Sequence, residues 1–154
     1  MGDLVFPLLS GVEPHFASAG ARVWVVEPLG LVSELFGHVT MADARLLSHT
    51  ASDAALALHE GGEGLRFMHD WRGIETYESG ARRELVDWGR RLGRDRMAQI
   101  DILMAPSNRL VRMGITVGVT AMAVLGVPIA IHESVEAMHA AGSRKRRPHP
   151  RARG

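Results

Sequence analysis

The stretch from Leu65 to Leu92, LRFMHDWRGIETYESGARRELVDWGRRL, constrains the fold more than any other part of the chain. It begins as an apolar run of strand-forming residues, which Arg72-Gly73 interrupts. Glu78-Ser79-Gly80 then marks a tight polar turn or helix start, because Ser caps free backbone N–H groups and Gly tolerates strained dihedral angles. The sequence therefore predicts a strand, a turn and an amphipathic helix, whose apolar stripe is Ala81, Leu85, Trp88 and Leu92.

Ser79 is placed at the N-terminus of this predicted helix. The helix dipole and the unpaired N–H groups favour negative charge at such a position, which suits a phosphoryl group. A serine there also serves as a structural helix cap in many proteins that bind no phosphate. The residue pattern leaves both roles open for Ser79.

The segment before this stretch predicts a β-hairpin and a helix. Two strand-forming runs within residues 22–39 are joined at Glu27-Pro28-Leu29-Gly30, where Pro and Gly occupy the positions that a type I turn favours. Thr40 and Asp43 resemble a capping box at the start of a helix, which Gly61-Gly62 ends.

The segment after it predicts two further strands, each followed by a helix. A strand at Gln99–Met104 leads through a capping turn to a helix from Arg109 to about Leu125, which Gly126 ends. A last strand, residues 127–131, contains Pro128 and is therefore expected at a sheet edge, and Ser134 caps a closing helix. The element order ββαβαβαβα predicts an α/β fold with a mixed sheet of about five strands flanked by helices.

Length and charge indicate one folded domain between two tails. With 154 residues, 46% of them hydrophobic, the chain has enough apolar material for one core. The segment from Arg144 holds six of the 18 basic residues, which leaves 12 basic against 17 acidic side chains before it. This balance argues against a nucleic-acid interface on the domain. We expect an irregular arm at 1–21, the domain at 22–142 and a disordered basic tail at 143–154.

Several classes of function are excluded or disfavoured by the residues present. The chain has no cysteine, so thiol catalysis, disulfides and cysteine-bound metals are excluded, and a cytoplasmic location is expected. No phosphate-binding loop and no Gly-x-Ser-x-Gly motif occurs, and Glu136 stands where a zinc-protease helix opened by His132-Glu133 needs its second histidine. His69-Asp70 is the one adjacent pair suited to acid–base work, and a structural role for it is favoured. We therefore expect no catalytic residues, no metal site and no cofactor.

The segment Met113 to Ile131 carries no charged residue and is long enough to be considered as a membrane span. Gly126-Val127-Pro128 divides it into a helix-length piece and a strand-length piece. A buried helix followed by a buried strand explains the same residues, and this interpretation is favoured over a span.

The segment DWRGIETYESGARREL resembles the signature of the anti-sigma-factor antagonist (STAS) family, which includes SpoIIAA-like and SEC14-like domains. Asp70 matches the acid that ends a strand in the family, Ile74 the apolar position after it, and Ser79-Gly80 the serine and glycine of the turn. Similar stretches at Leu35–Leu47 and Glu133–Ala141 extend the resemblance over about residues 21–141. The chain departs from the family where Glu78 replaces an Asp and where the turn is one residue shorter.

The resemblance implies a single STAS-like domain that acts as a non-enzymatic regulatory module. It implies that the turn and helix at 78–92 bind a regulatory protein, such as a kinase or an anti-sigma-like protein, under phosphorylation control at Ser79. The expected partner-binding residues are Asp70, Glu78, Ser79, Gly80, Arg82 and Arg83. An alternative is a lipid-binding or membrane-associated protein that uses the apolar segment 113–131, because lipid-carrying relatives shelter an apolar ligand beneath their helices. The partner's identity and the oligomeric state stay open.

Overall fold

The computed structural model describes residues 9, 11–26, 30–58, 64–104 and 108–145. The strands in this described part form one six-stranded sheet in the order β1-β2-β3-β4-β5-β6. The elements in chain order are β1 (Phe16–Ala17), β2 (Ala21–Val26), β3 (Gly30–Val39), α2 (Met41–Arg45), the π-helical turn η1 (Leu46–Ala51), α3 (Ser52–Leu58), β4 (Leu65–Tyr77), α4 (Ser79–Arg96), β5 (Met97–Leu103), α5 (Arg109–Val124), β6 (Ile129–His132) and α6 (Val135–Lys145).

The sheet is mixed, as the sequence predicted. β1, β2 and β3 pair antiparallel, and β3, β4, β5 and β6 pair parallel, so every connection from β3 onward crosses over through a helix. The predicted hairpin is confirmed by the pairing of Val26 with Gly30 and of Ala21 with Leu35. The three residues of its turn at 27–29 lie outside the described part of the chain.

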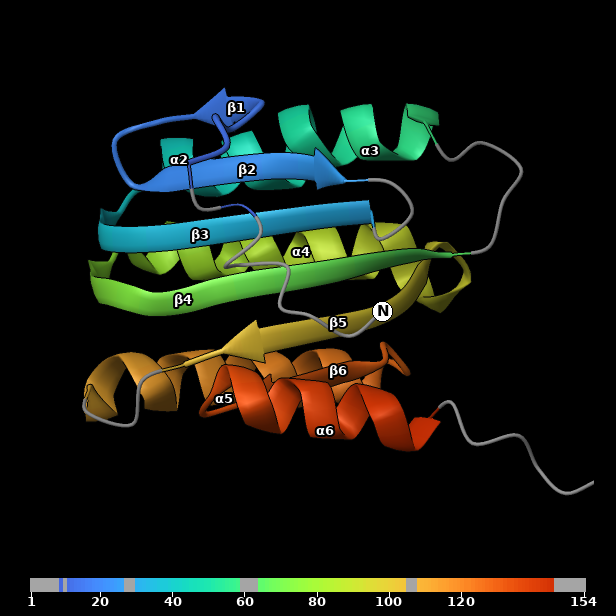
Figure 1. The fold of residues 1–154 in the computed structure, drawn as a ribbon. Coiled ribbons are helices and arrows are strands. Elements are labelled where there is room, and N and C mark those ends of the chain that lie inside the picture. The colour runs from blue at the N-terminus through green and yellow to red at the C-terminus, as the bar shows by residue number, and fades with distance from the viewer. Residues whose placement is uncertain (1–8, 10, 27–29, 59–63, 105–107, 146–154) are drawn as a thin grey trace, which may run out of the picture.

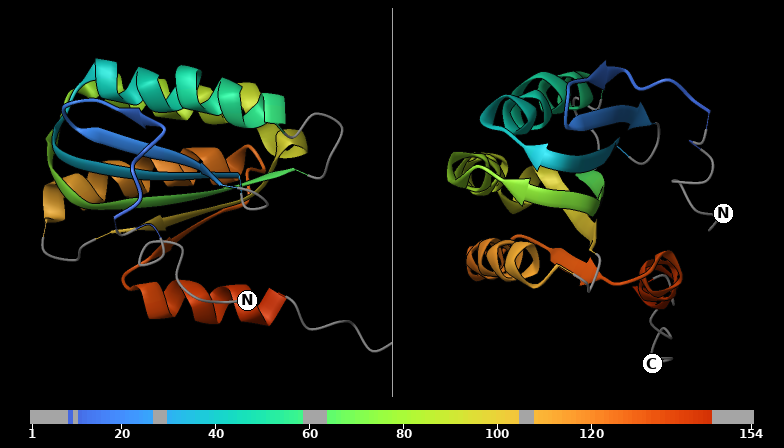
Figure 2. Two further views of the ribbon diagram at one scale, coloured as in Figure 1. Left: turned by 45° about the horizontal axis from the view of Figure 1, so that its top comes forward. Right: turned by 90° about the vertical axis from the view of Figure 1, so that its left-hand side faces the viewer.

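Helices cover the two faces of the sheet unequally (Figure 1). The segment α2–η1–α3, α4 and α5 lie side by side on one face, which we call the covered face, and among the described helices α6 covers the other (Figure 2). Each face has its own hydrophobic core. On the α6 side, Met138 packs with Trp24, Val32, Met68 and Leu103 from four neighbouring strands.

The main core lies on the covered face and is centred on β4. Phe67, His69 and Trp71 alternate along β4 and point to this face, since successive side chains of a strand point to opposite sides. Trp88 of α4 packs edge-on against Phe67, with the two ring centroids 5.2 Å apart. The predicted register of α4 is confirmed, because Ala81, Trp88 and Leu92 are buried in this core.

The break predicted at Arg72-Gly73 is wrong, because β4 continues as far as Tyr77. Gly73 pairs with Phe36 of β3, and a Cβ atom built on Gly73 would lie 3.0 Å from the Phe36 Cβ atom. The glycine therefore gives β3 room at a register shift between Glu34 and Phe36 instead of ending the strand.

The predicted first helix forms, and its capping box is confirmed. The Asp43 N–H donates to the Thr40 Oγ1 atom at 3.3 Å, and the Thr40 N–H donates to the Asp43 carboxylate at 2.8 Å. The same carboxylate accepts from Ser18 and Gly20 of the N-terminal arm at 2.5 and 3.1 Å. Burial raises the pKa of Asp43, but these hydrogen bonds outweigh it and hold the pKa below its ordinary value. Gly61-Gly62, the predicted helix end, lies outside the described residues.

Other boundaries differ from the predictions at both ends of the chain. The arm contributes the edge strand β1, so the described part of residues 1–21 is not entirely irregular, and the sheet has six strands instead of about five. Pro128 precedes β6, which occupies the opposite edge of the sheet as expected. The closing helix, where the Ser134 Oγ atom accepts from the Ala137 N–H at 3.1 Å, runs to Lys145 and so enters the predicted tail. Residues 146–154 of that tail lie outside the described part.

Removing the Trp88 side chain should destabilise the protein strongly. Trp88 is 4% exposed, and its Nε1–H donates to the Ser52 Oγ atom at 2.9 Å, so Trp88→Ala leaves both a cavity and an unpaired hydroxyl. We expect a loss of about 3–5 kcal/mol in the free energy of unfolding, measured by urea denaturation. Trp88→Phe, which keeps a ring against Phe67, should lose less. A loss below about 1 kcal/mol for Trp88→Ala, with easy quenching of Trp88 fluorescence in the wild type, would contradict the helix register.

Candidate functional site

The start of α4 lies where β4 leaves the sheet. The Glu78 N–H donates to the Val39 carbonyl oxygen at 2.9 Å, and the Glu78 carbonyl oxygen accepts from the Ala81 N–H at 3.0 Å. Glu78 therefore occupies the N-cap position, and no side chain caps the helix. Ser79 is the first helical residue and is exposed. The interpretation of Ser79 as a structural cap is therefore wrong, because the preceding residue takes that position.

Glu78 and Gly80 connect α4 to α2. The Glu78 Oε2 atom accepts from the Met41 N–H at 2.7 Å, so this carboxylate lies at the N-terminus of α2, where the helix dipole favours negative charge. A Cβ atom built on Gly80 would lie 3.0 Å from the Met41 Cε atom, so glycine fits here because the methionine packs closely. The geometry assigns these two predicted partner-binding residues a structural contact within the chain.

The exposed side of α4 forms a shallow concave surface with a volume of about 380 Å³. Within the described ranges, Arg82 and Arg83 form no ion pair, whereas Arg90 lies 4.0 Å from Asp87. Ser79 precedes the two unpaired arginines by three and four residues, so all three share one side of the helix. We call this surface the α4 face; it consists of Ser79, Arg82, Arg83, Val86, Asp87 and Arg90.

Asp70 does not join the α4 face. Its side chain lies on the opposite side of the sheet from His69, where it accepts hydrogen bonds from the Arg72 guanidinium at 2.8 and 2.6 Å. The hydrogen bond to Asp70 raises the pKa of Arg72, with smaller contributions from Glu136 of α6 and Glu34 of β3. The structure therefore separates Asp70 from the other predicted partner-binding residues. The same alternation separates the adjacent pair His69-Asp70, so it performs no joint acid–base role.

His69 is buried in the main core and is hydrogen-bonded to Ser33, which the sequence did not indicate as a partner. Its Nδ1 atom lies 2.6 Å from the Ser33 Oγ atom, and its ring stacks near Trp71 with the centroids 5.1 Å apart. Burial lowers the pKa of His69 from 6.5 to about 3, against a smaller opposing effect of Asp101. Both His69 and Ser33 are at most 1% exposed, so this Ser–His pair has no access to a substrate.

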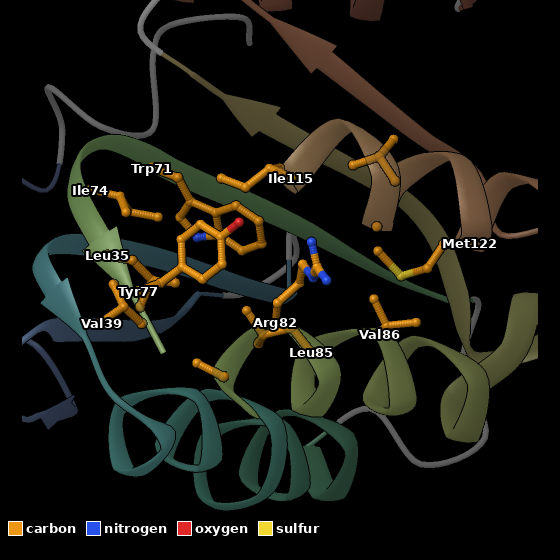
Figure 3. A pocket seen from close by; sticks show the side chains of 13 residues that line it. Leu35, Val39, Trp71, Ile74, Tyr77, Arg82, Leu85, Val86, Ile115 and Met122 are labelled. Carbon is orange, nitrogen blue, oxygen red and sulfur yellow. The ribbon is translucent and has the colours of Figure 1, made fainter. Parts of the chain in front are cut away.

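A narrow apolar groove separates α4 from α5 above β4 (Figure 3). Its cavity volume is about 40 Å³, whereas pockets that bind small molecules usually measure roughly 300–1,000 Å³. Trp71 Nε1 is buried in the described structure without a hydrogen-bond partner. The groove shares Arg82 and Val86 with the α4 face, and it is lined by Leu35, Val39, Trp71, Ile74, Tyr77, Ala81, Arg82, Leu85, Val86, Ile115, Gly118, Val119 and Met122.

The uncharged segment Met113–Ile131 divides into a helix and a strand as the favoured interpretation predicted, but the predicted burial of the whole helix is wrong, because Met113, Val117 and Val124 are exposed. α5 ends at Val124, Gly126 adopts a φ of +80°, and β6 begins at Ile129. In the described part of the chain, no helix is both long and apolar enough to cross a membrane. The alternative of a lipid ligand stays a prediction, although the groove in this conformation is too narrow for a lipid chain.

No group of three His, Asp or Glu side chains in the described ranges is arranged to hold a metal ion. Asp101, His132 and Arg66 form a polar cluster on the α6 side, in which Asp101 accepts from His132 at 2.8 Å and from the Arg66 Nη2 atom at 3.1 Å. Each group in this cluster is paired with a neighbour of the same sheet, so the cluster connects β4, β5 and β6.

Comparison with known proteins supports the fold. No protein-family model matches the chain, and no curated protein matches its sequence. A crystal structure from Shewanella loihica PV-4, of an uncharacterized protein from the DUF3478 family with a SpoIIAA-like fold, is similar to it. The similarity has a TM-score of 0.57 at 15% sequence identity and covers 80% of this chain and 96% of that chain. The chain therefore has the SpoIIAA-like fold that its resemblance to the STAS family implied.

Substitutions at the α4 start should separate the structural role of Glu78 from that of Ser79. Glu78→Ala removes the carboxylate from the Met41 N–H and should lower the free energy of unfolding by about 1 kcal/mol. Ser79→Ala removes no capping bond and should change it by less than about 0.5 kcal/mol. Urea denaturation measures both changes. The opposite order of effects would restore Ser79 as the helix cap.

The buried His69 should make stability depend on pH. The unfolded chain binds a proton at this residue below its ordinary pKa of 6.5, whereas the folded chain binds one only near pH 3. Acid therefore favours the unfolded state, and this residue should remove about 2 kcal/mol of stability between pH 7 and pH 5. His69→Phe should lack that dependence, whatever its stability at pH 7. Equal changes in the free energy of unfolding for both proteins across this range would contradict the burial of a neutral His69.

Proposed function

We propose that this chain is a non-enzymatic regulatory module of the cytoplasm that binds an acidic surface of a partner protein through the α4 face. The observation that carries this proposal is the unpaired state of Arg82 and Arg83, which form no ion pair among the described residues. Both side chains are exposed beside Ser79 in a concavity of about 380 Å³. Arginine is well suited to this role because its planar guanidinium binds carboxylates with two parallel hydrogen bonds.

The surroundings of the α4 face support an acidic partner over a basic one. Asp87, the acid of this face, is already placed beside Arg90. Glu84, one residue after Arg83, points toward η1, where it accepts from the Ser48 hydroxyl at 2.9 Å and pairs with His49 at 2.9 Å. The face therefore presents positive charge on a domain that is otherwise mildly acidic.

Phosphorylation of Ser79 would regulate this contact. A phosphoryl group would add nearly two negative charges at the first residue of α4, close to Arg82 and Arg83 on the same side of the helix. The helix N-terminus stabilises such charge, so the fold should persist. The arginines would then pair with the phosphate instead of a partner's carboxylates, and the acidic partner would be released.

Partner capture should depend on the charge of the α4 face. The immobilised chain, incubated with an extract of the cells that produce it, should retain an acidic protein that Arg83→Glu fails to retain. Arg45→Glu, an exposed charge reversal on α2, is the matched control and should retain that protein. Ser79→Ala should capture as wild type does, and Ser79→Asp should capture several-fold less.

Quantitative mass spectrometry of the retained proteins provides the measurement, and circular dichroism confirms that each variant is folded. Equal capture by Arg83→Glu and Arg45→Glu would refute the α4 face as the partner surface. Equal capture by wild type, Ser79→Ala and Ser79→Asp would refute the phosphorylation switch alone.

A further inference from the structure

The outer side of α5 carries an apolar row that the described structure leaves uncovered. Leu110, Met113, Val117 and Val124 are 77%, 63%, 58% and 82% exposed. Their spacing, with Ala121 between the last two, places them on one side of a helix whose opposite side packs into the core through Val111, Ile115 and Met122. We call these four residues the apolar stripe. Exposed apolar residues are usually scattered singly, and a contiguous row of them is typical of an interaction surface.

The apolar stripe lies beside the α4 face, because two glycines of α5 allow α4 and α5 to pack closely. A Cβ atom built on Gly114 would meet the Tyr77 hydroxyl group and lie 3.5 Å from the Arg82 guanidinium. One turn further along α5, a Cβ on Gly118 would lie 3.3 Å from Val86. The two helices therefore run side by side in the same direction, and Figure 2 shows them next to each other. Arg82 lies at the boundary between them, and Arg83 and Arg90 continue the arginine row on the exposed side of α4.

The other flank of the stripe is uncharged along most of its length. Thr116 and Thr120 are exposed there, and their hydroxyls donate to the carbonyl oxygens of Arg112 and Thr116 at 2.7 and 2.8 Å. Arg112 itself is paired with Glu133 at 2.7 Å. The surface thus consists of one apolar row with the arginine row of α4 along one side and Arg109 and Arg112 at the start of the other. The carboxylates beside it, Asp87 and Glu133, are already paired with Arg90 and Arg112.

We infer that this surface binds one amphipathic helix of the partner protein, with apolar side chains on the stripe and carboxylates toward the arginine row. The inference rests on the proposed function and adds the form of the partner. α5 has 16 residues and is about 24 Å long, so a stripe one side chain wide matches the footprint of a single helix. A second copy of this chain fits poorly, because two copies that share the stripe would supply arginine rows and no acids to pair with them. A bilayer is disfavoured because it would cover a far wider area than this row.

A synthetic 18-residue helical peptide with leucine at helical spacing and glutamate along one flank tests the inference. Fluorescence anisotropy with the full chain should show saturable binding, at least tenfold tighter than for the same peptide with lysine in place of glutamate. Val117→Lys should weaken binding of the glutamate peptide at least tenfold. Thr116→Lys, which changes an exposed neighbour off the stripe, should weaken this binding less than twofold. Arg83→Glu should also weaken that peptide and should reduce the preference over the lysine peptide.

The outcomes separate this inference from the proposed function. If Arg83→Glu weakens the glutamate peptide but Val117→Lys and Thr116→Lys act alike, the α4 face binds acids and the stripe plays no part. If none of these substitutions changes binding, or if a scrambled peptide of the same composition binds equally, both proposals fail. Flotation with phosphatidylglycerol vesicles that Val117→Lys abolishes would assign the stripe to a bilayer, and a wild-type dimer that Val117→Lys dissociates would assign it to a second copy. Either result would overturn the helix partner.

Discussion

The row of aromatic rings on β4 forms the centre of the hydrophobic core on the covered face. Phe67, His69 and Trp71 project from one side of this central strand, and Trp88 of α4 contacts both Phe67 and His69. Because Trp88 also donates to Ser52, the same indole connects the first helical segment to the sheet. The position of α4, and with it the direction in which the α4 face points, therefore depends on this row.

Local patterns in the sequence predicted the elements well, because each depends on neighbours along the chain. The Thr40–Asp43 capping box and the stripe through Trp88 involve spacings of three or four residues, and both are observed. Gly73 misled the prediction because its role depends on Phe36 of another strand. The structural role of Glu78 was missed for the same reason, because the sequence does not reveal that its carboxylate accepts a hydrogen bond from the Met41 N–H.

The candidate site was predicted in part for similar reasons. Arg82 and Arg83 follow Ser79 at helical spacing, so their common side of α4 could be read from the sequence, and the same spacing adds Val86 and Arg90. Asp70 was grouped with them by its place in a motif, although a strand presents it to the face opposite His69. The exposed side of α5 was missed because apolar residues occur on nearly every side of this helix, so its pattern does not show which side meets the sheet.

Both edges of the sheet are short, since β1 has two residues and β6 has four. A strand edge with unpaired backbone groups is a template on which another polypeptide can add a strand, and its reach grows with its length. Here the long strands β3 and β4 lie inside the sheet, and each is paired on both sides over its first half, along Gly30–Leu35 and Leu65–Asp70. The strand order thus places short strands at both edges, which limits the addition of a further strand there. The exposed apolar side chains of this chain lie instead on α5, whose backbone hydrogen bonds are made within the helix, so they offer no template for strand addition.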